Sequence, residues 1–297
     1  MFDFLKPLLN LTSDREVLAV LGYSIDLNVS PEEWEQKKRE LKQEQTLRQL
    51  ARHKALRENQ EMARLKTATL TELVDTYHEQ ALASSYALDY WKNEGLIQPT
   101  VKLHRLGFVS KCPVYFNQDK PDFKPASFVV PTYQNKQLVA IKHRIDGVKS
   151  DKYRMHVKGS AAQLFNVDRM FPSDEDLGWH FLHTERGTVI VVEGEKKAMV
   201  LDQWGFVTVG IPGLNTWQTN WLEFFNGCSK IIIVTDPDVE FDVKKRDHRD
   251  RMAQDFVGAN IPVYVANMSQ KPDDYFVRYG GTPEAFQNLL RWGRKVR

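Results

Sequence analysis

The chain contains very little cysteine. Cys112 and Cys228 are the only cysteines among 297 residues, and they lie far apart in the sequence. Neither has the spacing to histidine that zinc sites use, so the sequence predicts neither a disulfide framework nor a zinc site. This usage is typical of a protein from a reducing compartment, and we expect the cytoplasm.

Long apolar runs and a strong charge of one sign are also missing. No run approaches the ~18 apolar residues that a membrane span needs. Residues 1–17 lack a basic segment and a small-residue cleavage site, so we expect no signal peptide. The net charge is only +2, from 41 Lys and Arg against 39 Asp and Glu. Any nucleic-acid binding must therefore come from local basic patches.

The first of three expected regions, residues 1–69, is dominated by a charged stretch. Residues 31–66 contain no glycine and no internal proline, and Pro31 suits the first position of a helix. The stretch has 5 Lys, 5 Arg and 7 Glu, a net charge of +3, and its apolar residues are sparse. We expect one long, mostly solvated helix, which is either simply exposed or serves as an arm for a partner or for nucleic acid.

The rest of the chain changes its pattern near residue 186. Residues 70–185 open with a helical segment that ends near Gly95, and "SFVVPTY" and "QLVAIKHRI" then predict two strands around a "QNKQ" turn. Residues 186–297 alternate short apolar runs with helical segments, which predicts a parallel sheet covered on both faces. The expected fold class is α/β, in which an α+β subdomain and the long helix precede the parallel-sheet domain.

Acidic residues follow the predicted parallel strands. Glu193 ends "TVIVVE", Asp236 and Asp238 follow "KIIIVT", and Asp273 and Asp274 follow the next strand after a short loop. Ligands gather at the carboxyl ends of parallel strands, and packed carboxylates repel unless a cation offsets their charge. If the "DPD" backbone stays extended, its two carboxylates point to the same side. The pattern predicts a site for Mg²⁺, or for Mn²⁺, that also takes phosphates.

Basic residues lie near this expected site. Lys152 and Lys158 alternate with Tyr153 in "KYRMHVK", a mixture that proteins use to hold single strands, although a solvated hairpin would look the same. Lys196 and Lys197 come directly after the Glu193 turn. They either neutralise the acidic residues or meet a phosphate.

Several blocks of residues resemble the catalytic core of bacterial, DnaG-like DNA primases. "VVEG" and "DPD", each after an apolar strand, resemble the TOPRIM domain of topoisomerases and primases, in particular the variant of phage and plasmid replication proteins. "FVVPTYQNKQLVAIKHRI", "SDKYRMHVKGSAAQLFN" and the tail "PDDYFVRYGGTPEAFQNLL" are similar to further primase blocks. The resemblance covers residues 75–290, and the order of the blocks is more specific than any single block.

The resemblance implies an RNA primase that joins ribonucleoside triphosphates on single-stranded DNA during phage or mobile-element replication, beside a replicative helicase. It implies that Glu193, Asp236 and Asp238 are catalytic and bind metal, and that Asp273 is a further metal ligand. It also places basic and aromatic residues against template and nucleotide, and these are Arg144, Lys152 and Tyr153.

The sequence departs from the family pattern in several places. Lys271 stands where the primase tail has an acid, and Lys197 stands where an Asp is common after the "EG" pair. No CHC₂ zinc-finger spacing and no GxxxxGK motif are present, so we expect neither the template-reading module nor a helicase motor in this sequence. Two alternatives stay open: a TOPRIM nuclease in which the same acids activate water, and a non-catalytic protein that binds single-stranded DNA or a helicase.

Overall fold

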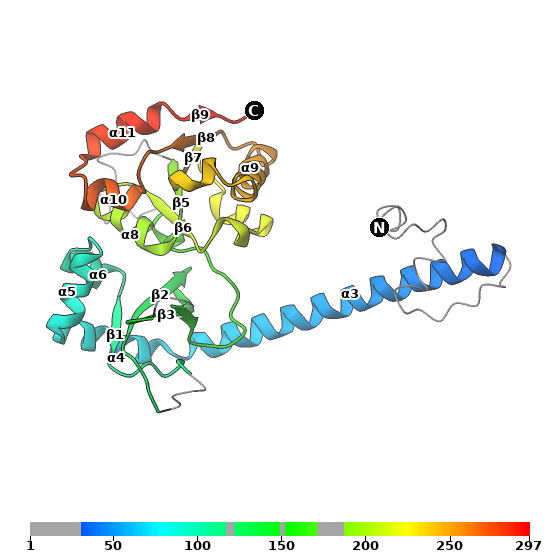
Figure 1. The fold of residues 1–297 in the computed structure, drawn as a ribbon, viewed down its shortest axis with the longest axis horizontal. Coiled ribbons are helices and arrows are strands. Elements are labelled where there is room, and N and C mark those ends of the chain that lie inside the picture. Colours follow the sequence, from blue (N-terminus) through cyan, green and yellow to red (C-terminus); the bar gives the residue numbers. More distant parts are fainter. Residues whose placement is uncertain (1–30, 117–121, 149–151, 171–186) are drawn as a thin grey trace. The chain divides into compact units, whose positions relative to one another are not determined.

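The computed structural model describes residues 31–116, 122–148, 152–170 and 187–297 (Figure 1). Residues 1–30 of the expected N-terminal region and residues 171–186, where the second expected region meets the third, lie outside them. The chain forms two compact units, residues 1–58 and 59–297.

Helix α3 spans Pro31–Ala68 and confirms the long charged helix. Along it, oppositely charged side chains pair one turn apart, as Arg48 does with Glu44 at 2.6 Å. Each such pair stabilises the helix by only about 0.2–0.5 kcal/mol. The last turns belong to the second unit, in which Ala63 and Thr67 are buried.

An antiparallel sheet in the order β1-β2-β3-β4 forms the first part of the second unit. Asn135 and Lys136 form the tight turn between its two long strands with positive φ angles of 53° and 60°, and the Asp168 carboxylate accepts both of their amide hydrogens. The two predicted strands and their turn are therefore confirmed. The strands are β1 (Gly107–Val109), β2 (Ser127–Gln134), β3 (Gln137–Ile145) and β4 (Tyr153–Met155).

Three helices that follow α3 precede this sheet in the sequence. The predicted helical segment forms two helices, because Ser84 breaks it and caps the second helix by accepting a hydrogen bond from the Ala87 amide. The helices are α4 (Thr71–Ala83), α5 (Ser85–Asn93) and α6 (Gln98–Leu103).

The second sheet has the order β6-β5-β7-β8-β9, and its first four strands are parallel, as predicted. The short edge strand β9 runs antiparallel to β8 and was not predicted. The strands are β5 (Thr188–Glu193), β6 (Thr208–Ile211), β7 (Lys230–Thr235), β8 (Val263–Asn267) and β9 (Arg294–Lys295).

Helices connect these strands. The α-helices are α8 (Glu195–Gln203), α9 (Val243–Gly258), α10 (Pro272–Val277) and α11 (Pro283–Arg291). Tighter 3₁₀ turns lie at Val167–Arg169 (η1), Leu214–Thr216 (η3), Thr219–Phe225 (η4) and Pro237–Glu240 (η5).

The apolar runs of the parallel strands are continuous because both faces of the sheet are covered. Ile190 and Val192 of β5 join the core formed with α8, α10 and α11, and the same core includes Phe128 of the antiparallel sheet. Val189 and Val191, on the other face, join the core that includes α9 and η4. One core therefore connects the two sheets, and it holds the ends of the parallel strands beside the antiparallel sheet.

Cys112 is a buried free thiol, and Cys228 is a partly buried one. Among the described residues, none of the helices has both the length and the apolar character that crossing a membrane requires.

A buried polar network crosses the antiparallel sheet. Nδ1 of His143 lies 2.9 Å from the Ser127 hydroxyl, and Nε2 lies 2.9 Å from Nδ1 of His156. His143 has no exposed surface, and its burial, together with the neighbouring His156, lowers its pKa to about 3. Burial also lowers the pKa of His156. Both rings are therefore neutral in the folded protein near neutral pH.

We expect mild acid to destabilise the fold through these rings. Since their folded-state pKa values are lowered, their contribution is present above the ordinary value of 6.5 and is lost as the pH falls toward the pKa of His143. One such histidine makes the free energy of unfolding fall by about 1.4 kcal/mol per pH unit. Urea unfolding between pH 7.5 and 5 measures this slope. His143→Gln should flatten the slope, whereas His53→Gln, on exposed α3, should leave it unchanged; equal slopes in all three proteins would contradict the assignment.

Candidate active site

The carboxyl ends of three neighbouring parallel strands carry the predicted acidic residues. Glu193 is the last residue of β5, and Asp236 directly follows β7, which pairs with β5. Asp273 lies in the first turn of α10, after β8. The parallel strands therefore bring these chain positions to one edge of the sheet, as predicted.

The side chains of Asp236 and Asp238, the two aspartates of "DPD", do not lie on the same side of the chain. Asp236 is extended, but the chain then turns into η5 at Pro237, so the extended backbone on which that expectation depended is absent. Asp236 is 8% exposed, whereas the side chain of Asp238 is 58% exposed and pairs with Lys245. The hydrogen bond from Lys245 lowers the pKa of Asp238.

The first turn of α8 carries three consecutive charged residues, which together have four partners. Gly194 makes the reversal from β5 into the helix with a φ of +97°, which disfavours any other residue. Glu195 then pairs with Lys142 of the antiparallel sheet. Lys196 lies 3.0 Å from Glu94 and 2.8 Å from Asp273, and Lys197 lies 3.0 Å from Asp236. Each residue along a helix points about 100° from the one before it, which is why neighbours reach different partners.

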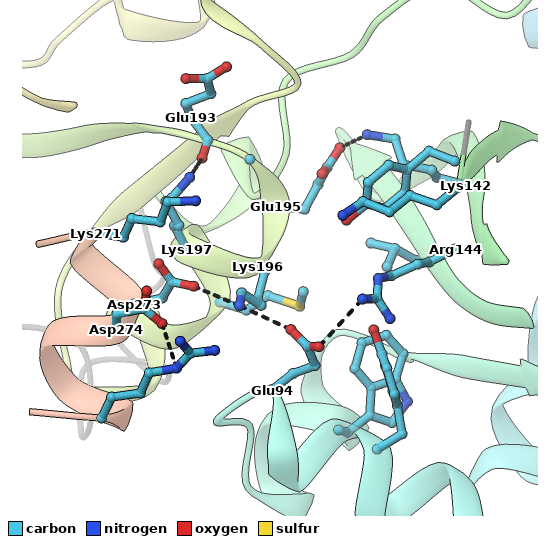
Figure 2. Close-up of a pocket in the computed structure, with 18 residues that line it drawn as sticks. Glu94, Lys142, Arg144, Glu193, Glu195, Lys196, Lys197, Lys271, Asp273 and Asp274 are labelled. Atoms are coloured by element: carbon cyan, nitrogen blue, oxygen red, sulfur yellow. Dashed lines mark hydrogen bonds and ion pairs between the residues drawn. The ribbon is translucent and has the colours of Figure 1, made fainter. Parts of the chain in front are cut away.

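Both lysines after the Glu193 turn thus neutralise acidic residues. Burial alone would lower the pKa of Lys196, but its contacts with Asp273 and Glu94 raise it, so its ammonium group stays charged. The ammonium group of Lys197 also donates a hydrogen bond of 2.8 Å to the backbone carbonyl of Glu193. The Glu193 side chain points away from Lys196 and Glu94 in Figure 2.

A pocket of 430 Å³ opens between the two sheets (Figure 2). Its lining includes Glu193 and Asp273 but neither Asp236 nor Asp238. The remaining charged lining residues come from both sheets and from their flanking helices, and they are Glu94, Lys142, Arg144, Lys152, Glu195, Lys196, Lys197, Lys271, Asp274 and Arg278. Counting all of these side chains, seven are basic and five are acidic, so the pocket has a net charge of +2. Such a pocket suits a phosphorylated ligand.

The predicted basic residues lie mostly in this pocket. Arg144 lies over the ring of Tyr90 at 5.0 Å, and the ammonium groups of Lys142 and Lys152 lie 5.7 and 5.6 Å from the centre of the Tyr153 ring. These are cation–π contacts, and they place an aromatic ring among positive charges. Lys158 is exposed in the turn after β4 and does not line the pocket.

Glu94 is a pocket residue that the sequence did not indicate. It caps the end of α5, and its carboxylate lies 3.0 Å from Lys196 and 3.7 Å from Arg144. With Asp273, these residues form a charge chain that runs Arg144–Glu94–Lys196–Asp273 across the pocket (Figure 2). No local pattern marks Glu94, because its partners lie 50 or more residues away.

Three of the predicted acidic residues lie beside lysines. Among the described residues, no three His, Cys, Asp or Glu side chains gather closely enough to hold a metal ion. Asp236, Asp238 and Asp273 each have a lysine as partner, so lysines already relieve the repulsion that was expected to require a cation. The donor chemistry still suits a divalent ion, because Asp273 is 2% exposed and its Oδ1 has no hydrogen-bond partner.

Comparisons with known proteins support the fold. No protein-family model and no curated protein matches the chain. Among solved structures, the chain is similar to a DnaG primase catalytic domain bound to single-stranded DNA, with a TM-score of 0.58 and 15% identity over 79% of this chain and 83% of that one. It is similar to a primase domain from Pseudomonas aeruginosa, with a TM-score of 0.57 and 19% identity over 76% and 79%.

A third similar structure contains the zinc-binding and RNA polymerase domains of the Aquifex aeolicus primase. The TM-score is 0.55 at 18% identity, and the chain covers 60% of that protein with 76% of its own length. At these identities the likeness establishes the fold. The chain therefore has the mixed α/β fold of bacterial DnaG primase catalytic cores, as its sequence blocks predicted.

Removing the charge of Glu94 should strengthen binding of a polyanion. Glu94→Gln keeps the size of the side chain but leaves Lys196 and Arg144 with less negative charge nearby. We expect a single-stranded oligonucleotide to bind about threefold more tightly at low salt, with the gain shrinking as salt screens the charge. Fluorescence anisotropy measures the affinity. The control is Glu79→Gln on an exposed face of α4, and a gain of the same size in the control, or no gain at Glu94, would contradict the prediction.

Proposed function

We propose that the chain is a primase-type nucleotidyl transferase, which joins ribonucleotides on single-stranded DNA during replication of a phage or mobile element. One observation carries the proposal. A 430 Å³ pocket joins acidic residues at the ends of parallel strands to basic and aromatic residues of an antiparallel sheet, within the fold of primase catalytic cores. This combination offers one face to a polyphosphate and another to a nucleic-acid strand.

The proposed metal ligands are the four acids expected from the sequence: Glu193, Asp236, Asp238 and Asp273. Asp236 and Asp273 are the strongest candidates, since both are buried at the sheet edge. A bound Mg²⁺ or Mn²⁺ would neutralise the charge of a triphosphate and make a 3′-hydroxyl more acidic.

The basic residues are proposed to position the two substrates. Lys196 and Arg144, now paired with Glu94, can exchange this partner for phosphate oxygens of a nucleotide in the pocket. Tyr153, flanked by Lys142 and Lys152, offers a ring on which a base can stack while the lysines contact its backbone. Lys158, outside the pocket, would contact the strand further along. Helix α3, with its many charged side chains, is the proposed contact for a replicative helicase.

A second candidate function is favoured by the lysine partners. Because Asp236, Asp238 and Asp273 are each paired with a lysine, the fold could bind single-stranded DNA or a helicase without catalysis. The two functions differ in product and not in binding, so only an activity assay separates them.

The deciding experiment offers the protein single-stranded DNA, labelled ribonucleotides and Mg²⁺ or Mn²⁺. Short labelled oligomers support the primase, degraded DNA supports a nuclease, and binding without either product supports the non-catalytic protein. If the protein is a primase, Asp236→Asn should lower synthesis by at least about 100-fold, because it removes a charge from the metal site. Asp89→Asn, an exposed position on α5, is the control, and an Asp236→Asn protein as active as this control would contradict the proposed site.

A separate prediction tests the nucleic-acid face. Lys152→Ala should weaken binding of a single-stranded oligonucleotide and lower the slope of log affinity against log salt by about 0.7, the share of one phosphate contact. Lys102→Ala, exposed on α6 and outside the pocket, should leave the slope unchanged. If the Lys152→Ala protein has the same salt slope as the unmodified protein, Lys152 makes no phosphate contact and is simply a solvated loop residue.

A further inference from the structure

Asp236 is held between two ammonium groups. Nζ of Lys197 lies 3.0 Å from its Oδ1, without the direction of a hydrogen bond, and Nζ of Lys271 lies 3.8 Å from its Oδ2. The side chain of Asp236 is only 10% exposed, so water screens these charges poorly. One buried carboxylate thus faces two positive charges.

The two lysines are held differently. Lys197 is 13% exposed and is fixed by its hydrogen bond to the Glu193 carbonyl. Lys271 is the N-cap of α10, and its side chain is 54% exposed, so it moves at lower cost. Both line the pocket, although Asp236 itself does not. Each ammonium group therefore lies where it can contact Asp236 on one side and an anion in the pocket on the other.

A divalent cation at Asp236 must displace these lysines or bind beside them. Like charges a few ångströms apart at a poorly screened site repel strongly, and the carboxylate already has its charge balanced. Asp273 is in a similar state, because Lys196 holds its Oδ2 at 2.8 Å while its Oδ1 is buried without a hydrogen-bond partner. The acidic residues are thus suited to a cation, but fixed cations of the chain occupy their immediate surroundings.

We propose that Lys197 and Lys271 act as internal cations that compete with a divalent metal for Asp236, and that a polyphosphate in the pocket draws them away. The proposal rests on the metal site of the proposed function. It means that the same two side chains oppose metal binding in the free protein and favour binding of a polyphosphate. Metal and polyphosphate would then enter the site together, since each relieves the unpaired charge that the other creates.

Two binding measurements on the full chain test this dual role. Titration with Mn²⁺, followed by electron paramagnetic resonance in the absence of any nucleotide, gives the metal affinity. Titration with tripolyphosphate in the absence of metal, followed by calorimetry, gives the anion affinity. Removing a lysine charge should change the two affinities in opposite directions, whereas loss of folded protein would lower both.

The variants are Lys197→Met and Lys271→Met, which keep much of the side-chain length and remove the charge. We expect each to bind Mn²⁺ about tenfold more tightly and tripolyphosphate about fivefold more weakly, as expected for one unit charge at a poorly screened site. Lys271→Arg keeps the charge and should retain both original affinities. Lys102→Met, outside the pocket, should change neither.

Unchanged or weaker Mn²⁺ binding in both methionine variants would overturn the proposal, and so would unchanged tripolyphosphate binding. These outcomes are separate from the fate of the proposed function. If primers are made but the lysine variants do not shift metal binding, the competition is wrong and the primase stands. If the affinities shift as expected but no primers form, the competition stands and the primase is wrong.

Discussion

The first turn of α8 is the structural feature on which the site depends. Three successive side chains, Glu195, Lys196 and Lys197, bind partners in the antiparallel sheet, in α5 and α10, and at the end of β7. A single helical turn therefore connects the two sheets around the pocket. Removing one partner of a partly buried ion pair of this kind leaves a charge that water solvates poorly, so each pair opposes a separation of the elements that it joins. The buried strand β5 and the tight connection at Gly194 set the position of this helical turn.

The parallel sheet was predictable because its signal is local. Alternate residues of β5 face two different cores, which requires a continuous apolar run, and the sequence shows one. The edge strand β9 escaped prediction, since two exposed residues carry no apolar pattern. The break between α4 and α5 also escaped it, although Ser84 is a recognisable helix cap.

The candidate site was predictable only in part, because strand ends have a local sequence signal and ion pairs between distant residues do not. Strand ends can be found from the sequence, and so Glu193, Asp236 and Asp273 were placed at the sheet edge. The lysines beside Asp236 and Asp273 could not be found in this way, since Lys197 lies 39 positions from Asp236 in the sequence and Lys196 lies 77 positions from Asp273. The expectation of a metal cluster assumed that acidic residues brought together must share a cation from solution. In the described structure, lysines of the chain already lie beside Asp236, Asp238 and Asp273, and the turn into η5 leaves Asp238 exposed.

The similarity of the fold to primase cores and the pairing of the acidic residues with lysines have different physical causes. The fold follows from buried strands and their order, which tolerate wide change in surface residues. The chemistry follows from which charges face one another at the strand ends. At Asp236, two lysines reduce the field that would attract a divalent cation, yet both line a pocket suited to phosphates. If metal and polyphosphate bind as proposed, the site would respond to their combined charge, because neither ligand alone would leave all of its charges paired.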